Sequence, residues 1–114
     1  MKVIGYCRVS TEEQAREGIS LDNQQQKIRA YCELYGHDLL EIITDAGQSA
    51  KSVNRDGMQR LLKLTERKGA VDGIVVYKLD RLFRNAEEAL RYSSQWDKKG
   101  IALHSVLDLT YPRF

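Results

Sequence analysis

The sequence predicts an α/β domain built on a mainly parallel β-sheet. Short apolar runs alternate along the chain with longer segments whose apolar residues recur at helical spacing, a pattern typical of strands joined by crossover helices. A glycine follows each helical segment, where helices commonly end. Strands are expected at 3–9, 39–45, 73–77 and 101–107, and helices at 21–35, from a cap at Asn54 or Asp56 to Lys68, and at 86–99.

The first strand places reactive side chains at its end. Because side chains alternate between the faces of a strand, one face is expected to carry Val3, Gly5, Cys7 and Val9, and the other Ile4, Tyr6, Arg8 and Ser10. A serine just past a buried strand, two residues from an arginine, is suited to be a nucleophile beside an anion-holding group. The alternative is that Ser10 caps a turn and that Arg8 pairs with a surface acid.

The expected helices have one apolar face each. For the helix at 21–35 this face comprises Leu21, Ile28, Tyr31, Cys32 and Tyr35. The helix after Asn85 has a capping box made with Glu88. Its inner face is predicted to comprise Ala86, Ala89, Leu90, Ser93 and Trp96, with Trp96 in the core.

Basic residues follow the third strand. Lys78, Arg81 and Arg84 come directly after 73–77, and Arg81 and Arg84 share a face if this segment is helical. An arginine fork matches two phosphate oxygens and stays charged at any working pH. The alternative for Arg84 is an ion pair with Asp80 at i, i+4 spacing.

With the first strand central, the strand order is 2-1-3-4 and the fold is a flavodoxin-like three-layer sandwich. The crevice of such a sheet opens at the carboxyl ends of strands one and three, where the winding reverses. Ser10 leaves strand one there, and Arg81 and Arg84 follow strand three. Arginines around a serine make a site for attack on a phosphodiester.

Four segments, in order and at matching intervals, resemble the catalytic domain of the serine recombinases, the family of resolvases, invertases and large serine integrases. They are Tyr6-Cys7-Arg8-Val9-Ser10-Thr11, Leu21-Asp22-Asn23-Gln24, Asp45 with Arg55 downstream, and Lys78-Leu79-Asp80-Arg81-Leu82-Phe83-Arg84-Asn85, and together they cover residues 2–108. The resemblance implies that Ser10 attacks a DNA phosphate, giving a 5′-phosphoserine link and a free 3′-hydroxyl. Strands then exchange and rejoin without ATP or another cofactor.

The resemblance also implies roles for the residues around Ser10. Those that hold phosphate are Arg8, Arg55, Lys78, Arg81 and Arg84. Tyr6 lines the site and Gln24 lies beside it, the alternatives being a tyrosine that covers the sheet edge and a solvent-facing helix residue. Asp45 is expected to orient a neighbouring arginine or loop amide. The base that takes the serine proton stays open between Asp80 and an arginine-bound phosphate oxygen.

Charge and composition are consistent with DNA as the partner. The net charge is +2, but residues 51–84 hold nine basic and four acidic residues, which suits a polyanion on one side. For Arg60, Lys63 and Arg67 a solvated helix face is the favoured alternative. No apolar run approaches the ~20 residues that span a bilayer. The N-terminus has no signal-peptide form, so a cytoplasmic protein without membrane contact is expected.

Cysteines and histidines suggest no metal site. Cys7 and Cys32 lie in apolar periodic contexts and are expected to be buried free thiols. His37 and His104 are far apart in sequence, so neither zinc nor another metal is predicted.

Residues 1–114 are expected to be a single catalytic domain, C-terminally truncated relative to the family. Family members continue into a long dimerisation helix and a DNA-binding region, so the full-length protein is expected to act as a homodimer or tetramer, and the isolated fragment not to recombine DNA. Two alternatives stay open. One is a catalytically silent, DNA-associated or regulatory remnant of the same fold. The other is an unrelated phosphate-binding α/β domain, against which the absence of a nucleotide-binding glycine loop counts.

Overall fold

The computed structural model describes residues 1–9, 21–46, 56–79, 82–83 and 85–107. These residues form β1 (Lys2–Val9), α2 (Leu21–Tyr35), β2 (Asp38–Ala46), α3 (Asp56–Leu64), β3 (Gly73–Val76), α4 (Ala86–Lys98) and β4 (Ala102–Ser105). The four strands make one parallel sheet in the order β2-β1-β3-β4. The predicted fold class and strand order are confirmed. No helix in the described part of the chain has the length and apolar character needed to cross a membrane.

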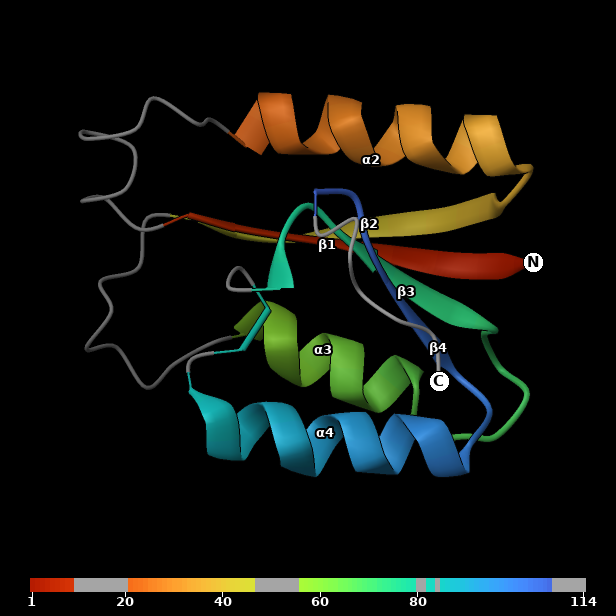
Figure 1. Ribbon diagram of the computed structural model, residues 1–114, viewed down its shortest axis with the longest axis vertical. Coiled ribbons are helices and arrows are strands. Elements are labelled where there is room, and N and C mark those ends of the chain that lie inside the picture. The colour runs from red at the N-terminus through yellow and green to blue at the C-terminus, as the bar shows by residue number, and fades with distance from the viewer. Residues whose placement is uncertain (10–20, 47–55, 80–81, 84, 108–114) are drawn as a thin grey trace.

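The sheet is the middle of three layers. Figure 1 shows α2 on one face of the sheet and α3 and α4 on the other. Val3 and Cys7 of β1 pack with Ile28 and Cys32 of α2. Ile4 and Tyr6 of β1 face the opposite way and belong to the larger core under α3 and α4. That core also includes Met58, Leu61, Ile74, Leu82 and Trp96. The alternation predicted for β1 is therefore confirmed in its described residues, and β1 is buried on both faces.

The ends of two helices match the sequence and the end of the third does not. Gly36 and Gly100 follow α2 and α4 with positive φ angles of 71° and 73°, which glycine adopts without steric cost. α3 ends at Leu64, so the prediction that it runs to Lys68 is wrong. The Glu66 amide donates to the Lys63 carbonyl at 3.2 Å, three residues back. The chain thus tightens from the α-helical pattern into a turn.

Two predicted inner faces need correction. Leu90 of α4 is 75% exposed, whereas Trp96 is buried. Successive residues of a helix are about 100° apart around its axis. Ala89 is partly buried, so Leu90, the next residue, is turned away from the buried face. Tyr35 of α2 is 60% exposed, and the buried residue that the prediction omitted from this face is Gln24.

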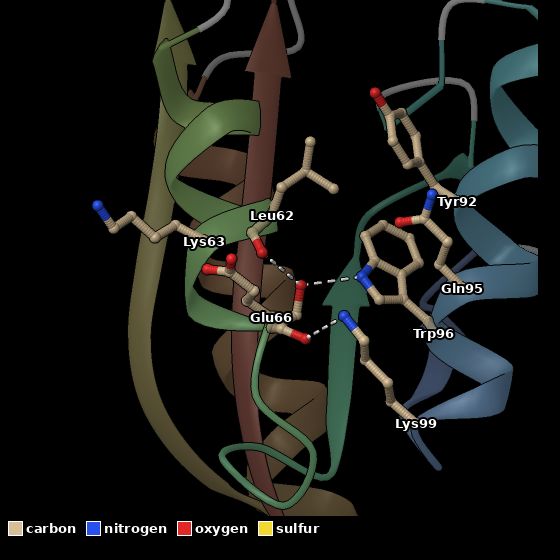
Figure 2. A pocket seen from close by; sticks show the side chains of 8 residues that line it. Leu62, Lys63, Glu66, Tyr92, Gln95, Trp96 and Lys99 are labelled. Carbon is tan, nitrogen blue, oxygen red and sulfur yellow. Dashed lines mark hydrogen bonds between the residues drawn. The ribbon is translucent and has the colours of Figure 1, made fainter.

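α3 and α4 are joined near their C-terminal ends (Figure 2). The Trp96 indole N–H donates to Thr65 Oγ1 at 2.9 Å, and the Lys99 ammonium donates to the Thr65 carbonyl at 3.4 Å. A hollow of about 400 Å³ opens beside these contacts, lined by Leu62, Lys63, Thr65, Glu66, Tyr92, Gln95, Trp96 and Lys99. None of these residues belongs to the predicted catalytic set, so the hollow lies apart from that site. Trp96 is 2% exposed, as predicted for a core residue.

Candidate active site at the carboxyl ends of β1 and β3

The strands that precede the predicted catalytic residues are neighbours. β1 and β3 run parallel, with Tyr6 opposite Val76. Their carboxyl ends therefore reach the same edge of the sheet, at the point where the strand order reverses. Open α/β sheets bind their ligands in this crevice. Ser10 follows the last residue of β1 in sequence, and Lys78 lies two residues after β3.

The described residues hold half of the predicted site. Tyr6, Arg8, Gln24, Asp45 and Lys78 lie within them. The other predicted site residues, Ser10, Arg55, Asp80, Arg81 and Arg84, lie outside them. The roles given to these five stay predictions.

Asp45 joins β2 to β1 and to the start of α3. Asp45 is buried, with 6% of the residue exposed. It accepts the Tyr6 hydroxyl at 2.5 Å, the Gly57 amide at 2.8 Å and the Met58 amide at 3.1 Å. A negative charge at a helix N-terminus satisfies otherwise unpaired amides and is favoured by the helix dipole. Tyr6 is fully buried, so the alternative in which it covers the sheet edge is wrong.

The contact between Asp45 and α3 requires glycine at position 57. A Cβ atom there would lie 2.7 Å from the carboxyl carbon and both oxygens of Asp45. We expect Gly57→Ala to lower the free energy of unfolding by about 1–3 kcal/mol, the range for overpacking a tight site. Urea unfolding measures this. Gln59→Ala, at an exposed position of the same helix, is the control, and a Gly57→Ala variant as stable as that control would contradict the geometry.

The Gln24 side chain hydrogen-bonds to the backbone near the end of β1. It is fully buried, so the alternative of a solvent-facing residue is wrong. Its Oε1 accepts the Arg8 amide at 3.4 Å, and its Nε2 donates to the Arg8 carbonyl at 3.3 Å. Pairing of β1 with β3 stops at Tyr6, and the Gln24 amide bonds to both backbone groups of Arg8, as a neighbouring strand would. This side chain therefore holds the backbone two residues before Ser10.

Removing this amide is expected to loosen the end of β1. Gln24→Leu keeps the volume roughly constant but leaves the Arg8 backbone groups without these partners, so we expect unfolding to become easier by about 1–3 kcal/mol. Hydrogen exchange should show the larger change at the Arg8 amide. Gln26→Leu, on the exposed side of α2, is the control. Equal protection of the Arg8 amide in both variants would refute the role given to Gln24.

The segment after β3 is anchored by its described residues. The Leu79 carbonyl accepts the Leu82 and Phe83 amides at 3.0 and 3.1 Å, and Leu82 is fully buried. Asn85 caps α4, accepting the Glu88 amide at 2.8 Å, which confirms the predicted cap. Lys78 is partly buried beside this turn. Leu82 is therefore held in the core, and Asn85 is held at the start of α4. These two described residues lie on either side of Arg84 in sequence.

The cysteine on β1 is unsuited to nucleophilic chemistry. Burial raises the pKa of the Cys7 thiol to about 12, an effect that Arg29 partly offsets. The thiol is therefore protonated at neutral pH, and the protonated form is a poor nucleophile. Burial also raises the pKa of Cys32. Both cysteines are free and buried, as predicted.

Sequence reasoning expected Asp45 to orient a neighbouring arginine or loop amide, but it missed the bond of Asp45 to Tyr6 and the way in which Gln24 holds Arg8. The bond between Tyr6 and Asp45 spans 39 residues, and no local pattern signals it. The Gly57 and Met58 amides carry no side-chain signature either. Gln24 could have been found, since it stands four residues before Ile28 and eight before Cys32, on the buried face of α2.

The chain is similar to a known protein family and to several known proteins. The family model described as Resolvase, N terminal domain, matches residues 3–112. The chain is 44% identical over 61 residues to the uncharacterized immunity region protein 3 of Bacillus phage phi105, covering 54% of this chain and 74% of that protein. It is 35% identical over 109 residues to the DNA-invertase hin of Salmonella typhimurium, covering 95% of this chain and 49% of the invertase.

A solved structure extends the likeness to three dimensions. The N-terminal catalytic domain of TP901-1 integrase matches with a TM-score of 0.79 and 36% identity, covering 93% of this chain and 77% of that one. The chain spans about half the length of the curated invertases and resolvases that it matches. Because the family model matches nearly all of the chain, we conclude that this chain belongs to the resolvase family of serine recombinases, as a catalytic domain of the resolvase and invertase type.

Proposed function

We propose that this domain cleaves and rejoins DNA through a covalent link to Ser10. The Ser10 hydroxyl oxygen attacks a phosphodiester phosphorus, and the bond from phosphorus to the 3′-oxygen breaks. The products are a 5′-phosphoserine and a DNA 3′-hydroxyl, which takes up a proton as it leaves. The energy of the broken bond is kept in the phosphoserine, so the reverse attack by a 3′-hydroxyl can rejoin strands without ATP.

Arginine side chains supply the charge that this reaction needs. Arg8, Arg81 and Arg84 are proposed to hold the non-bridging phosphate oxygens, where negative charge is spread in the transition state. Arg55 and Lys78 add further contacts to phosphate. The serine proton passes either to Asp80 or to an arginine-bound phosphate oxygen.

The observation that carries the proposal is the pairing of β1 with β3. Their carboxyl ends are adjacent and parallel, which supports a site shared by the serine that follows β1 in sequence and the arginines that follow β3. The Gln24 amide on Arg8 and the Asp45 carboxylate on Tyr6 support it further, because they hold the strand that leads into Ser10. Precise placement of reacting groups is worth several kcal/mol of the barrier.

Covalent capture on DNA tests this proposal. Nicked duplexes with random central sequences release a short oligonucleotide on cleavage, which prevents rejoining and traps the adduct. Joining this chain to a separate sequence-specific DNA-binding domain, with its site placed beside the nick, would raise the local concentration of the chain at the DNA. We expect a protein–DNA band that survives denaturing electrophoresis. If no such band forms although the fusion binds DNA, the proposal fails.

DNA is the proposed partner, and pairs of subunits on DNA are the proposed active assembly. For residues 1–114 alone we expect only weak, sequence-independent binding, about 10⁻⁴–10⁻⁶ M at physiological salt, through phosphate contacts that weaken as salt rises. The three described helices all lie against the sheet (Figure 1), whereas base reading needs an element in a groove. Gel-shift titrations at two salt concentrations, on random duplexes and candidate sites, measure this. Nanomolar, salt-resistant, site-selective binding would contradict it.

A further inference from the structure

The fold brings together the two histidines of the chain, which lie 67 positions apart. The ring centres of His37 and His104 are 5.2 Å apart. The Tyr31 ring lies 6.0 Å from that of His104 and 6.1 Å from that of His37. Tyr31 comes from α2, His37 from the turn after it and His104 from β4. The sequence predicted no metal site because the two histidines are far apart along the chain. In the folded chain they are neighbours, so that reason does not hold.

Two donor atoms in this group stand at the spacing of ligands on one metal ion. The Tyr31 hydroxyl and His104 Nδ1 form a long hydrogen bond of 3.3 Å. Two ligand atoms at ~2.0–2.1 Å from a tetrahedral zinc ion are separated by about 3.3–3.4 Å. Two imidazoles bound to such an ion have ring centres about 5 Å apart, close to the 5.2 Å observed.

The surroundings of His104 leave one nitrogen for coordination. Its Nε2 is buried and has no hydrogen-bond partner among the residues that the structure describes, and a Cβ at position 73 would lie 3.4 Å from that atom. Nδ1 faces the Tyr31 hydroxyl instead. The neutral imidazole is the form that binds metals. All three side chains are partly exposed, so an ion can reach them from solvent.

We propose that Tyr31, His37 and His104 bind one borderline divalent transition-metal ion, such as Zn²⁺, with water in the fourth position. Neutral imidazole is the commonest metal ligand and suits such ions, and the Tyr31 oxygen is the third donor in this proposal. Binding displaces the phenol proton of Tyr31, which passes to solvent. The ion links α2, the turn after it and β4. It lies about 10 Å along α2 from Gln24, so its role is to clamp the helix onto the edge strand, apart from the DNA chemistry.

Zinc titration of the tag-free chain tests this site. Calorimetry is expected to show one Zn²⁺ per chain. Because the chain has only two histidines, NMR spectra of the imidazole nitrogens report on both directly, and both are expected to shift together at one equivalent. Tyr31→Phe, His37→Gln and His104→Gln are each expected to weaken binding by at least about 10-fold, the size of effect that even outer-shell changes produce at metal sites.

Tyr35→Phe is the matched control. Its ring packs on Tyr31 at 4.7 Å and on His37 at 6.3 Å, but its hydroxyl is outside the proposed ligand set, so zinc affinity is expected to stay the same. His37→Gln changes a partly exposed turn residue and should remain folded by circular dichroism even if His104→Gln does not. Unchanged zinc affinity in folded His37→Gln, or no shift of either imidazole with zinc, overturns the proposal.

Discussion

The Ser10→Ala variant is expected to form no covalent link to DNA while keeping the fold. The substitution removes only the hydroxyl oxygen that is proposed to attack phosphorus. The neighbouring Cys7 thiol is not expected to replace it, since burial raises the pKa of that thiol to about 12 and the thiol stays protonated. Denaturing gels of nicked DNA substrates should show the adduct with the unsubstituted protein and none with Ser10→Ala.

A neighbouring hydroxyl provides the control. Thr11→Ala removes the next side chain along the chain and is expected to leave the adduct in place. Circular dichroism and urea unfolding should be unchanged in both variants. An adduct that persists in Ser10→Ala would remove the serine from its assigned role, whatever the behaviour of Thr11→Ala.

The Asp45→Ala variant is expected to lose more stability than a change at any exposed carboxylate on β2. Three hydrogen bonds to a buried charge disappear, and the Tyr6 hydroxyl and the Gly57 and Met58 amides lose this acceptor. Leaving such groups unsatisfied costs about 1–3 kcal/mol each when buried, so a loss of about 3–5 kcal/mol is expected after partial relaxation. Urea unfolding at pH 7 measures it.

Glu41 supplies the contrast on the same strand. Its carboxylate accepts both N–H groups of an Arg60 fork, at 2.7 and 2.9 Å, and the Arg60 side chain is 56% exposed. This hydrogen bond lowers the pKa of Glu41, yet exposed pairs add little to stability. Glu41→Ala is therefore expected to unfold almost as the unsubstituted protein does. Equal losses in Asp45→Ala and Glu41→Ala would show that Asp45 does not hold α3 to β1.

The layout of the fold could be predicted because it depends on local patterns. Strand alternation placed Val3 and Cys7 opposite Ile4 and Tyr6, and helical spacing with the following glycine located α2 from Leu21 to about Tyr35. In open α/β sheets the crevice lies where the strand order reverses, and this rule located the candidate site at the carboxyl ends of β1 and β3. None of these steps needed a contact between particular distant side chains.

The parts that could not be predicted depend on such contacts. From the sequence, Gln24 stayed open between a place beside the site and a solvent-facing one, since only the packed fold shows that the pairing of β1 with β3 ends at Tyr6. The contact of His37 with His104 arises because the turn after α2 lies beside β4. Leu90 was expected inside because periodicity locates a helix face only to within about one residue, and Trp96 determines which face of α4 is buried.

Mapping the linked amino acid tests the proposed chemistry most directly. Trypsin cuts after Arg8 and Arg16, so the peptide 9–16 carries Ser10 and Thr11. After digestion of the trapped adduct with trypsin and nuclease, mass spectrometry is expected to find a nucleotide joined through its 5′-phosphate to Ser10. A nucleotide on Tyr6 or Thr11, or one joined to Ser10 through its 3′-phosphate, would contradict the proposed mechanism.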